Sequence, residues 1–263
     1  MTQLIINPNR NFHDQTDAFF ERWKNKHIED GLTGFCEDGL MYRGAIKTTV
    51  ADGFLYREKG NEEVLWTNAP KRVLFLNKDA NDNPGQDIRE WIFRQHETDI
   101  TVRIYKNMAL WLYGLLKVDE NGIAPDFDTI STRDYSTFID KTPIAYVNCK
   151  KESGTSSIGN HSLAIHLEGY KDFIKEQIQL LDPDIIVCGG GSSAIKDFVT
   201  NNVYLNTIQV NTWMFFNEEN NKLIIDSFHP SYHFLSSKEI YNRMMVKYKD
   251  FSNAYPKFRS TCR

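Results

Sequence analysis

Cysteine is scarce in this sequence of 263 residues, and the few cysteines stand far apart. They are Cys36, Cys149, Cys188 and Cys262. No CxxC pair is present, and zinc sites and iron–sulfur clusters usually depend on such spacing. Three histidines, His161, His166 and His233, lie at no ligand spacing from an acidic residue. We therefore expect no cofactor and no metal, neither an iron–sulfur cluster nor a structural zinc, and we expect free thiols in a reducing compartment.

Long apolar runs are also missing. No stretch is long enough to cross a bilayer, and residues 1–10 lack the apolar region of a signal peptide. We therefore expect a cytoplasmic protein without a membrane partner. There is no internal repeat, while 41% hydrophobic and 13% aromatic residues suffice for a substantial core. The length suits one large domain, or a domain with an elaborated N-terminal part.

Neither sign of charge dominates the chain. The net charge of −4 argues against a protein that coats nucleic acid non-specifically. The distribution is uneven, because residues 238–263 carry seven basic and two acidic side chains. Such a segment could guide a phosphate backbone. Charge alone slightly favours the other interpretation, a solvated helix. The sequence indicates no obligate protein partner.

Two apolar runs, each ending abruptly in polar residues, indicate the fold. One lies within residues 72–83 and the other within residues 223–231, and each is typical of a buried parallel strand. Further strands are expected at 144–147 and 184–188, with a strand pair between 207 and 226. Because strands alternate with helices, we predict a parallel sheet covered on both faces. The expected fold is a three-layer α/β/α sandwich with a short, mainly parallel central sheet.

The chain divides into two parts of different pattern. Residues 71–263 carry the alternating strands and helices of the predicted α/β/α domain. Residues 1–70 are expected to form an extension packed on this core, with a helix over 14–27 and then loops and short β-structure. His27 lies near the apolar face of that helix. A loop is expected over 119–137. The other expected helices lie at about 87–94, 103–116, 170–181, 192–199 and 236–251.

Polar groups follow each expected strand, and ligands bind at the carboxyl edge of a parallel sheet. In chain order these groups are Lys78, Asp79, Asn81 and Asp82; Asn148, Lys150 and Lys151; Gly189 to Gly191 with Ser192; and His229 to His233. A carboxylate at Asp79 and an imidazole at His229, facing one crevice, suggest a hydrolytic site. Each group also has a structural interpretation, such as a helix cap for Asp79 or a tight turn for the glycines.

The order and spacing of these features resemble the uracil-DNA glycosylase superfamily, most closely its thermophile branch. That branch has a strand ending in an acidic loop, a strand ending in Asn, and a His-Pro-Ser motif, which here lies at 229–231. The resemblance covers about residues 71–250. It implies that Asp79 positions or activates water, that Asn148 reads the edge of the base, and that His229 stabilises the departing base anion.

The resemblance also makes DNA the expected partner. A base in a duplex must be flipped out before its bond is cleaved, so a wedge and grips for the phosphates are needed. Phe234 and Leu235 are the expected wedge. The other expected DNA contacts are Lys150, Lys151, Gly190, Ser192, Arg243 and Lys247. Asn81, Asp82 and Ser231 are expected to bind the substrate beside Asn148.

The chain departs from the family pattern in its first motif, which usually carries glycine and proline beside the acid. Here the residues are Lys78-Asp79-Ala80-Asn81-Asp82, so Asp82 could be the functional acid instead. The cluster cysteines of the thermophile branch are absent. The ring that would stack on the base is not identified, and Trp91 and Phe93 are candidates. Two alternatives stay open: a non-catalytic nucleic-acid or nucleotide binder on the same fold, and a hydrolase of free nucleosides or nucleotides.

Overall fold

The computed structural model describes residues 12–49, 55–58, 61–80, 85, 87–91, 97–152 and 158–260. Its centre is a seven-stranded sheet with the order β1-β5-β4-β6-β9-β8-β7. Its strands are β1 (Gly39–Met41), β4 (Val73–Asp79), β5 (Ile144–Lys150), β6 (Ile185–Gly189), β7 (Ile208–Gln209), β8 (Met214–Asn217) and β9 (Lys222–Ser227). The four central strands are parallel, whereas β1, β8 and β7 are antiparallel to their neighbours. A separate hairpin pairs β2 (Ile46–Thr49) with β3 (Leu55–Arg57).

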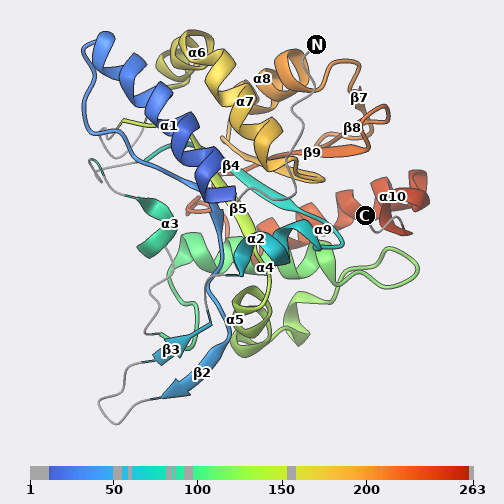
Figure 1. Ribbon diagram of the computed structural model, residues 1–263. Coiled ribbons are helices and arrows are strands. Elements are labelled where there is room, and N and C mark those ends of the chain that lie inside the picture. Colours follow the sequence, from blue (N-terminus) through green and yellow to red (C-terminus); the bar gives the residue numbers. More distant parts are fainter. Residues whose placement is uncertain are drawn as a thin grey trace.

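Helices cover both faces of the sheet (Figure 1). They are α1 (Phe12–Glu29), α2 (Glu62–Thr67), α3 (Ile88–Trp91), α4 (Arg103–Leu116), α5 (Thr132–Asp140), α6 (Asn160–Gly169), α7 (Lys171–Leu181), α8 (Ala194–Phe198), α9 (Ser237–Ala254) and α10 (Pro256–Ser260), with short helical turns η1 (Phe127–Thr129) and η2 (Val199–Val203). One layer contains α1, α6, α7 and α8, and the other contains α4, α5 and α9. The predicted α/β/α fold is confirmed. None of the helices described is both long and apolar enough to traverse a membrane.

The central strands are apolar because both of their faces are covered. In β4, Val73 and Phe75 pack in the layer of α4 and α9, while Leu74 and Leu76 pack in the layer of α1 and α7. All four side chains are fully buried. A strand that is buried on both faces has no polar alternation, which is why these strands stand out in the sequence as continuous apolar runs.

The loop predicted over 119–137 is wrong from Thr132 onward, where α5 begins after its N-cap residue Ser131. The Ser131 hydroxyl accepts a hydrogen bond from the backbone N–H of Asp134, and the Asp134 carboxylate accepts one from the backbone N–H of Ser131. This reciprocal cap starts a helix. Helices α2 and α6 were not expected either. In α6 only Leu163 and Leu167 are buried, so its apolar stripe is too narrow to indicate a helix.

The N-terminal part contributes a strand to the central sheet. β1 pairs antiparallel with β5, so that Gly39 lies opposite Tyr146 and Met41 lies opposite Ile144. Phe19, Phe20 and Trp23 of α1 are fully buried in the layer of α7. Residues 39–41 therefore form one edge of the sheet.

Asp38, immediately before β1, is a fully buried carboxylate with three donors around it. It accepts hydrogen bonds from the backbone N–H of Asn148 (2.8 Å), from Nε2 of Gln177 (2.9 Å) and from Nζ of Lys151. Lys151 is itself fully buried. Buried charges are tolerated when they are paired and hydrogen-bonded. Asp38 therefore fastens the end of β5 to the N-terminal segment.

The Asp38→Asn variant should be strongly destabilised, because the ammonium of Lys151 would stay buried without a counter-charge. Removing one partner of a buried ion pair typically costs about 3–5 kcal/mol. The matched control is Glu168→Gln, which removes the exposed pair with Lys171, a type of pair worth about 0–1 kcal/mol. Urea unfolding followed by circular dichroism measures both losses. A loss no larger than that of the control would contradict the role assigned to Asp38.

Candidate functional site

Four neighbouring strands carry small polar or glycine residues in one row at the carboxyl edge of the sheet. Asn77 of β4 lies in register with Asn148 of β5 and with Gly189 of β6, and Gly189 lies in register with Ser227 of β9. Aligned residues of parallel strands point to the same face. This face is the one covered by α4, since Phe75, two residues before Asn77, packs there. The sequence analysis did not single out Asn77, which lies inside β4, or Ser227, which ends β9.

The amide groups of this row are buried and incompletely hydrogen-bonded. Within the described residues, neither amide atom of Asn148 makes a hydrogen bond, and the same holds for Oδ1 of Asn107 on α4 and Oγ of Ser227. Asn77 faces the hydroxyl of Tyr146, but both of its amide atoms fall short of hydrogen-bond geometry. Because an unpaired buried polar group costs about 1–3 kcal/mol, this concentration of such groups makes the row the candidate site for a polar ligand.

Gly189 lets the loop that contains His229 lie close to this row. A Cβ atom at Gly189 would lie 2.3 Å from Oδ1 of Asn77 and 3.0 Å from Cδ of Pro230. Asn107 holds the same loop, because its Nδ2 donates a hydrogen bond to the carbonyl of Pro230 at 2.6 Å. The loop after β9 therefore lies against the ends of β4 and β6. This arrangement brings His229 to the same edge as Asn148.

His229 is held as a neutral ring that carries its proton on Nε2. The backbone N–H of Ser231 donates to Nδ1 at 3.2 Å, and the Ser231 hydroxyl lies 2.7 Å from the same nitrogen. Because a backbone N–H can only donate, Nδ1 is the acceptor and Nε2 bears the hydrogen. Burial lowers the pKa of His229 to about 4, and the charge of Lys78 adds to this shift. Ser231 therefore sets the tautomer of the histidine.

The end of this loop is fixed at its backbone and projects one aromatic ring. Arg103 of α4 donates to the carbonyl of Tyr232 at 2.7 and 2.9 Å and also to the carbonyl of Leu235. Phe234 is 75% exposed, whereas Leu235 is half-buried and packs on the core. Of the two residues predicted as a wedge, Phe234 is thus the one that reaches solvent.

Asp79 is the last residue of β4 and lies in register with Lys150. Because it is two residues beyond Asn77, its half-buried side chain points to the same face of the sheet. The predicted substrate residues Asn81 and Asp82 lie outside the described residues. The same is true of Phe93 and of the side chain of Trp91.

The two lysines that follow Asn148 do not form a basic rim. Lys151 is fully buried in its pair with Asp38, so the prediction that it contacts DNA is wrong. Lys150 turns toward Glu152, with its Nζ 3.2 Å from the backbone oxygen and 3.7 Å from Oε1 of that residue. Both lysines were predicted as DNA contacts because they follow the strand expected at 144–147, at the carboxyl edge of the sheet.

The glycine-rich turn after β6 is closely packed. A Cβ atom at Gly190 would lie 2.9 Å from the carbonyl oxygen of Ser192 and 3.3 Å from the side chain of Ile195. Gly190 is buried, so it faces the protein and not a phosphate chain. The hydroxyl of Ser192 is also buried, and it has no hydrogen-bond partner among the described residues.

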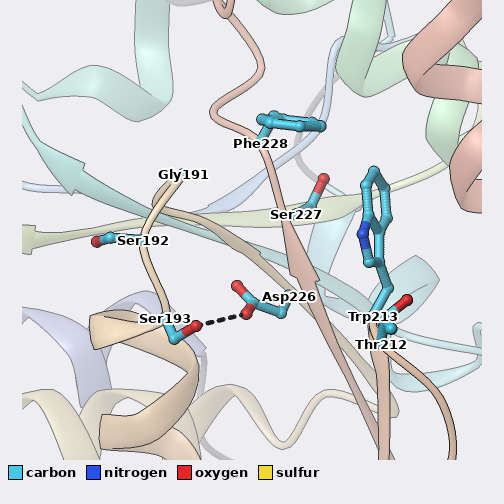
Figure 2. Close-up of a pocket in the computed structure, with 8 residues that line it drawn as sticks. All are labelled: Gly191, Ser192, Ser193, Thr212, Trp213, Asp226, Ser227 and Phe228. Carbon is cyan, nitrogen blue, oxygen red and sulfur yellow. Dashed lines mark hydrogen bonds between the residues drawn. The ribbon is translucent and has the colours of Figure 1, made fainter.

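A hollow of about 160 Å³ lies next to this turn (Figure 2). It is lined by Gly191, Ser192, Ser193, Thr212, Trp213, Asp226, Ser227 and Phe228. Within it, Oγ of Ser193 donates to Oδ2 of Asp226 at 3.0 Å, and burial raises the pKa of Asp226. Ser227 belongs to both the hollow and the polar row, whereas Asn148 and His229 do not line the hollow.

A second hollow of about 420 Å³ adjoins the first and shares Trp213 and Phe228 with it. Its other lining residues are Asn242, Arg243, Val246 and Lys247 of α9. The rings of Trp213 and Phe228 lie 5.5 Å apart, edge to face. Arg243 and Lys247, both predicted DNA contacts, thus lie beside two aromatic rings. Cations next to aromatic faces are the groups that bind single-stranded nucleic acid.

Comparison with known proteins adds no assignment. No family model matches the chain, and no curated protein matches it at a significant level. The side chains at the carboxyl edge of the parallel strands are a row of buried amides, a neutral histidine donor and a carboxylate.

Gly189→Ala should disturb the site and lower stability, because the added methyl group would overlap Oδ1 of Asn77. Overpacking of a buried position typically costs about 1–3 kcal/mol. Gly169→Ala is the matched control, since a Cβ atom there meets nothing within 4 Å. Thermal unfolding measures both changes. Equal effects of the two substitutions would show that the close approach at Gly189 is not a constraint.

The tautomer and the pKa of His229 can be measured by long-range proton–nitrogen NMR, with His229→Gln used to assign the resonances. We expect a neutral ring with its hydrogen on Nε2 at pH 7, and a titration midpoint near pH 4. The reason is that burial disfavours the charged ring. A midpoint near pH 6.5, the ordinary value for histidine, or a hydrogen on Nδ1, would refute this description.

Proposed function

We propose that this protein is a uracil-DNA-glycosylase-like hydrolase, which cleaves the N-glycosidic bond of a base flipped out of DNA. The observation that carries the proposal is the buried amide of Asn148, which lies in register with Asn77 at the carboxyl edge of the sheet. The loop that contains His229 is held at the same edge by Asn107. The chain order of Asp79, Asn148 and His229, which resembles that of the superfamily, supports the same function.

The unpaired amide of Asn148 suits recognition of a pyrimidine edge. An amide has one oxygen acceptor and one nitrogen that donates, so it can pair with adjacent N–H and C=O groups of a uracil-like base. A buried group of this kind discriminates strongly, because a base without the complementary groups would leave it unpaired. Asn148 is also rigidly placed, since its backbone N–H is held by Asp38 at 2.8 Å.

His229 suits stabilisation of the leaving base. As the C1′–N bond breaks, its electron pair moves to the base, and negative charge develops on the carbonyl oxygens of that base. A neutral ring that carries a hydrogen on Nε2 can donate to such an oxygen, and a fixed donor aimed at developing charge is usually the largest catalytic term. The Asp79 carboxylate would stabilise the positive sugar and accept a proton from the attacking water. The hydroxyl of that water then bonds to C1′.

Cations and an exposed ring support DNA over a smaller substrate. Arg243 and Lys247 line the hollow next to Trp213, and Phe234 projects from the loop that carries His229. The inward orientation of Lys150 and Lys151 favours the second candidate, a hydrolase of free nucleosides or nucleotides, because it removes two cations from the expected rim.

Single-turnover cleavage of oligonucleotides that carry uracil, hypoxanthine, xanthine or a mismatched thymine tests the proposal, with free nucleosides assayed in parallel. We expect His229→Gln to slow cleavage by about 10²–10³-fold, a typical effect of losing one such donor. Its DNA affinity should stay unchanged, because the donor acts on charge that appears only in the transition state. Asn148→Ala should abolish discrimination between bases.

DNA binding is tested separately through the salt dependence of affinity. Arg243→Ala should weaken binding and reduce the salt slope by about 1, whereas Lys249→Ala, an exposed position of α9 outside the hollow, is the matched control. Binding without cleavage would favour a non-catalytic binder. Cleavage of free nucleosides alone would favour the second candidate. If the protein neither binds DNA nor cleaves any of these substrates, the proposal is wrong.

A further inference from the structure

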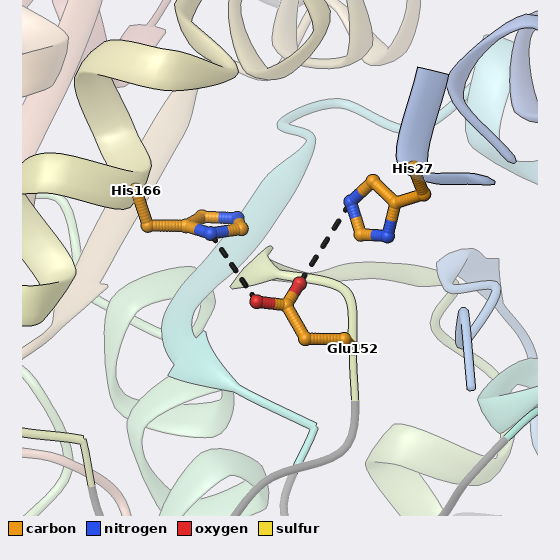
Figure 3. A group of neighbouring side chains, drawn as sticks. All are labelled: His27, Glu152 and His166. Carbon is orange, nitrogen blue, oxygen red and sulfur yellow. Dashed lines mark ion pairs between the residues drawn. The ribbon is translucent and has the colours of Figure 1, made fainter. Parts of the chain in front are cut away.

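Three side chains from distant parts of the chain meet in the layer of α1 and α6, on the face of the sheet away from α4. His27 lies in the last turn of α1, Glu152 follows β5, and His166 lies on α6. Figure 3 shows the carboxylate between the two imidazole rings. Its Oε2 lies 3.8 Å from Nε2 of His27, and its Oε1 lies 3.4 Å from Nδ1 of His166. One ligand atom from each residue lies within 4.8 Å of the other two.

Several polar atoms of this cluster have no hydrogen-bond partner. His27 is 1% exposed, and in the described part of the chain neither of its ring nitrogens makes a hydrogen bond. The same is true of Nε2 of His166 and Oε2 of Glu152. Buried nitrogen and oxygen atoms are almost always satisfied in folded proteins. Each of the three residues thus offers an unpaired atom, and ligand atoms of the three lie within 4.8 Å of one another, as around an ion that accepts electron pairs.

We propose that His27, Glu152 and His166 bind a divalent transition-metal ion, of which Zn²⁺ is the best match. Two imidazoles and one carboxylate are an established zinc ligand set, with bonds of about 2.0–2.2 Å that place tetrahedral ligand atoms about 3.3–3.6 Å apart. Nε2 of His166 is the ligand atom of that ring, because Nδ1 is the nitrogen that bonds to the carbonyl of Cys149. The 3.8 Å between Nε2 of His27 and Oε2 of Glu152, both without a partner among the described residues, needs only a small side-chain movement. Ca²⁺ and Mg²⁺ fit poorly, because both prefer oxygen ligands.

The surroundings of the cluster favour metal binding. The backbone bridge between Phe35 and Glu152 fixes the acidic residue, and a hydrogen bond to the carbonyl of Cys149 orients His166. Such outer contacts are typical of metal ligands. The ring of Tyr170 lies 4.7 Å from both imidazoles. Burial lowers the pKa of both histidines to about 4, so they are neutral at pH 7, and neutral imidazole is the form that ligates metal.

Lys150 competes with a metal ion for the carboxylate of Glu152. Its Nζ lies 3.7 Å from Oε1 of Glu152, so the ammonium and a metal ion would repel each other. The alternative to a metal site is therefore an ion-pair cluster that joins α1, α6 and the end of β5. The sequence predicts no metal, because His166 has no acidic residue at ligand spacing. The proposal departs from that expectation, since folding supplies His27 and Glu152 from far away in the chain.

The test uses the full, tag-free chain, stripped of metal with a chelator and titrated with Zn²⁺ against a chromogenic chelator. We expect one tight site per chain and a rise of the unfolding temperature with Zn²⁺. Glu152→Gln and His166→Asn should each weaken binding by roughly tenfold or more, an effect at least as large as losing an outer-sphere partner. His161→Asn, an exposed histidine on the same helix, should bind Zn²⁺ like the wild type. Lys150→Met should tighten binding by removing the competing charge.

A measurement on the wild type covers the case in which a variant fails to fold. Binding of Co²⁺ should give visible absorption bands of a site with nitrogen ligands, and Zn²⁺ should shift the NMR signals of two histidines only. Absence of stoichiometric binding by the wild type, or equal binding by the wild type and a folded Glu152→Gln, would overturn the proposal and leave an ion-pair cluster. None of these measurements depends on DNA cleavage, so the metal site is tested independently of the proposed function.

Discussion

The buried carboxylate of Asp38 is the contact on which the central strands and the candidate site both depend. It satisfies three donors at once: the backbone of Asn148, the ammonium of Lys151 and the amide of Gln177. Two of these donors belong to the segment that ends β5, and the third belongs to α7. Because none of the three reaches water, each would lose its partner without the N-terminal segment. The position of Asn148 is therefore determined by a residue that precedes the α/β/α core in the chain.

The sequence predicted the parts of the fold in which local pattern and tertiary environment agree. Strand β4 was recognisable because both of its faces are covered, and α4 because its buried residues recur with helical spacing. Prediction from the local sequence pattern failed where tertiary contacts determine the secondary structure. Only three residues form β1, and they become a strand because β5 offers them backbone partners. Helix α6 buries only two side chains and resembles a polar loop when considered alone.

The same distinction applies to the candidate site. Asp79, Asn148 and His229 could be proposed because each lies at or after the end of an apolar run. Nothing in the local sequence indicates that Asn77 faces Gly189, or that Lys151 is neutralised by Asp38, because these contacts join segments that are far apart. For a similar reason His27 was predicted on an apolar helix face but not as a neighbour of Glu152 and His166. Local sequence patterns do not indicate contacts between segments that are far apart in the chain.

The short antiparallel strands at the two edges of the sheet affect how the protein behaves at high concentration. Edge strands present unpaired backbone groups to which another chain can add, and short edges limit such association. β7 has two residues and β1 has three, whereas the parallel strand β5 behind β1 has seven, of which six are buried. Detachment of β1 would uncover a long apolar edge that readily nucleates aggregation. The N-terminal segment thus covers the edge of β5, to which another chain could otherwise add.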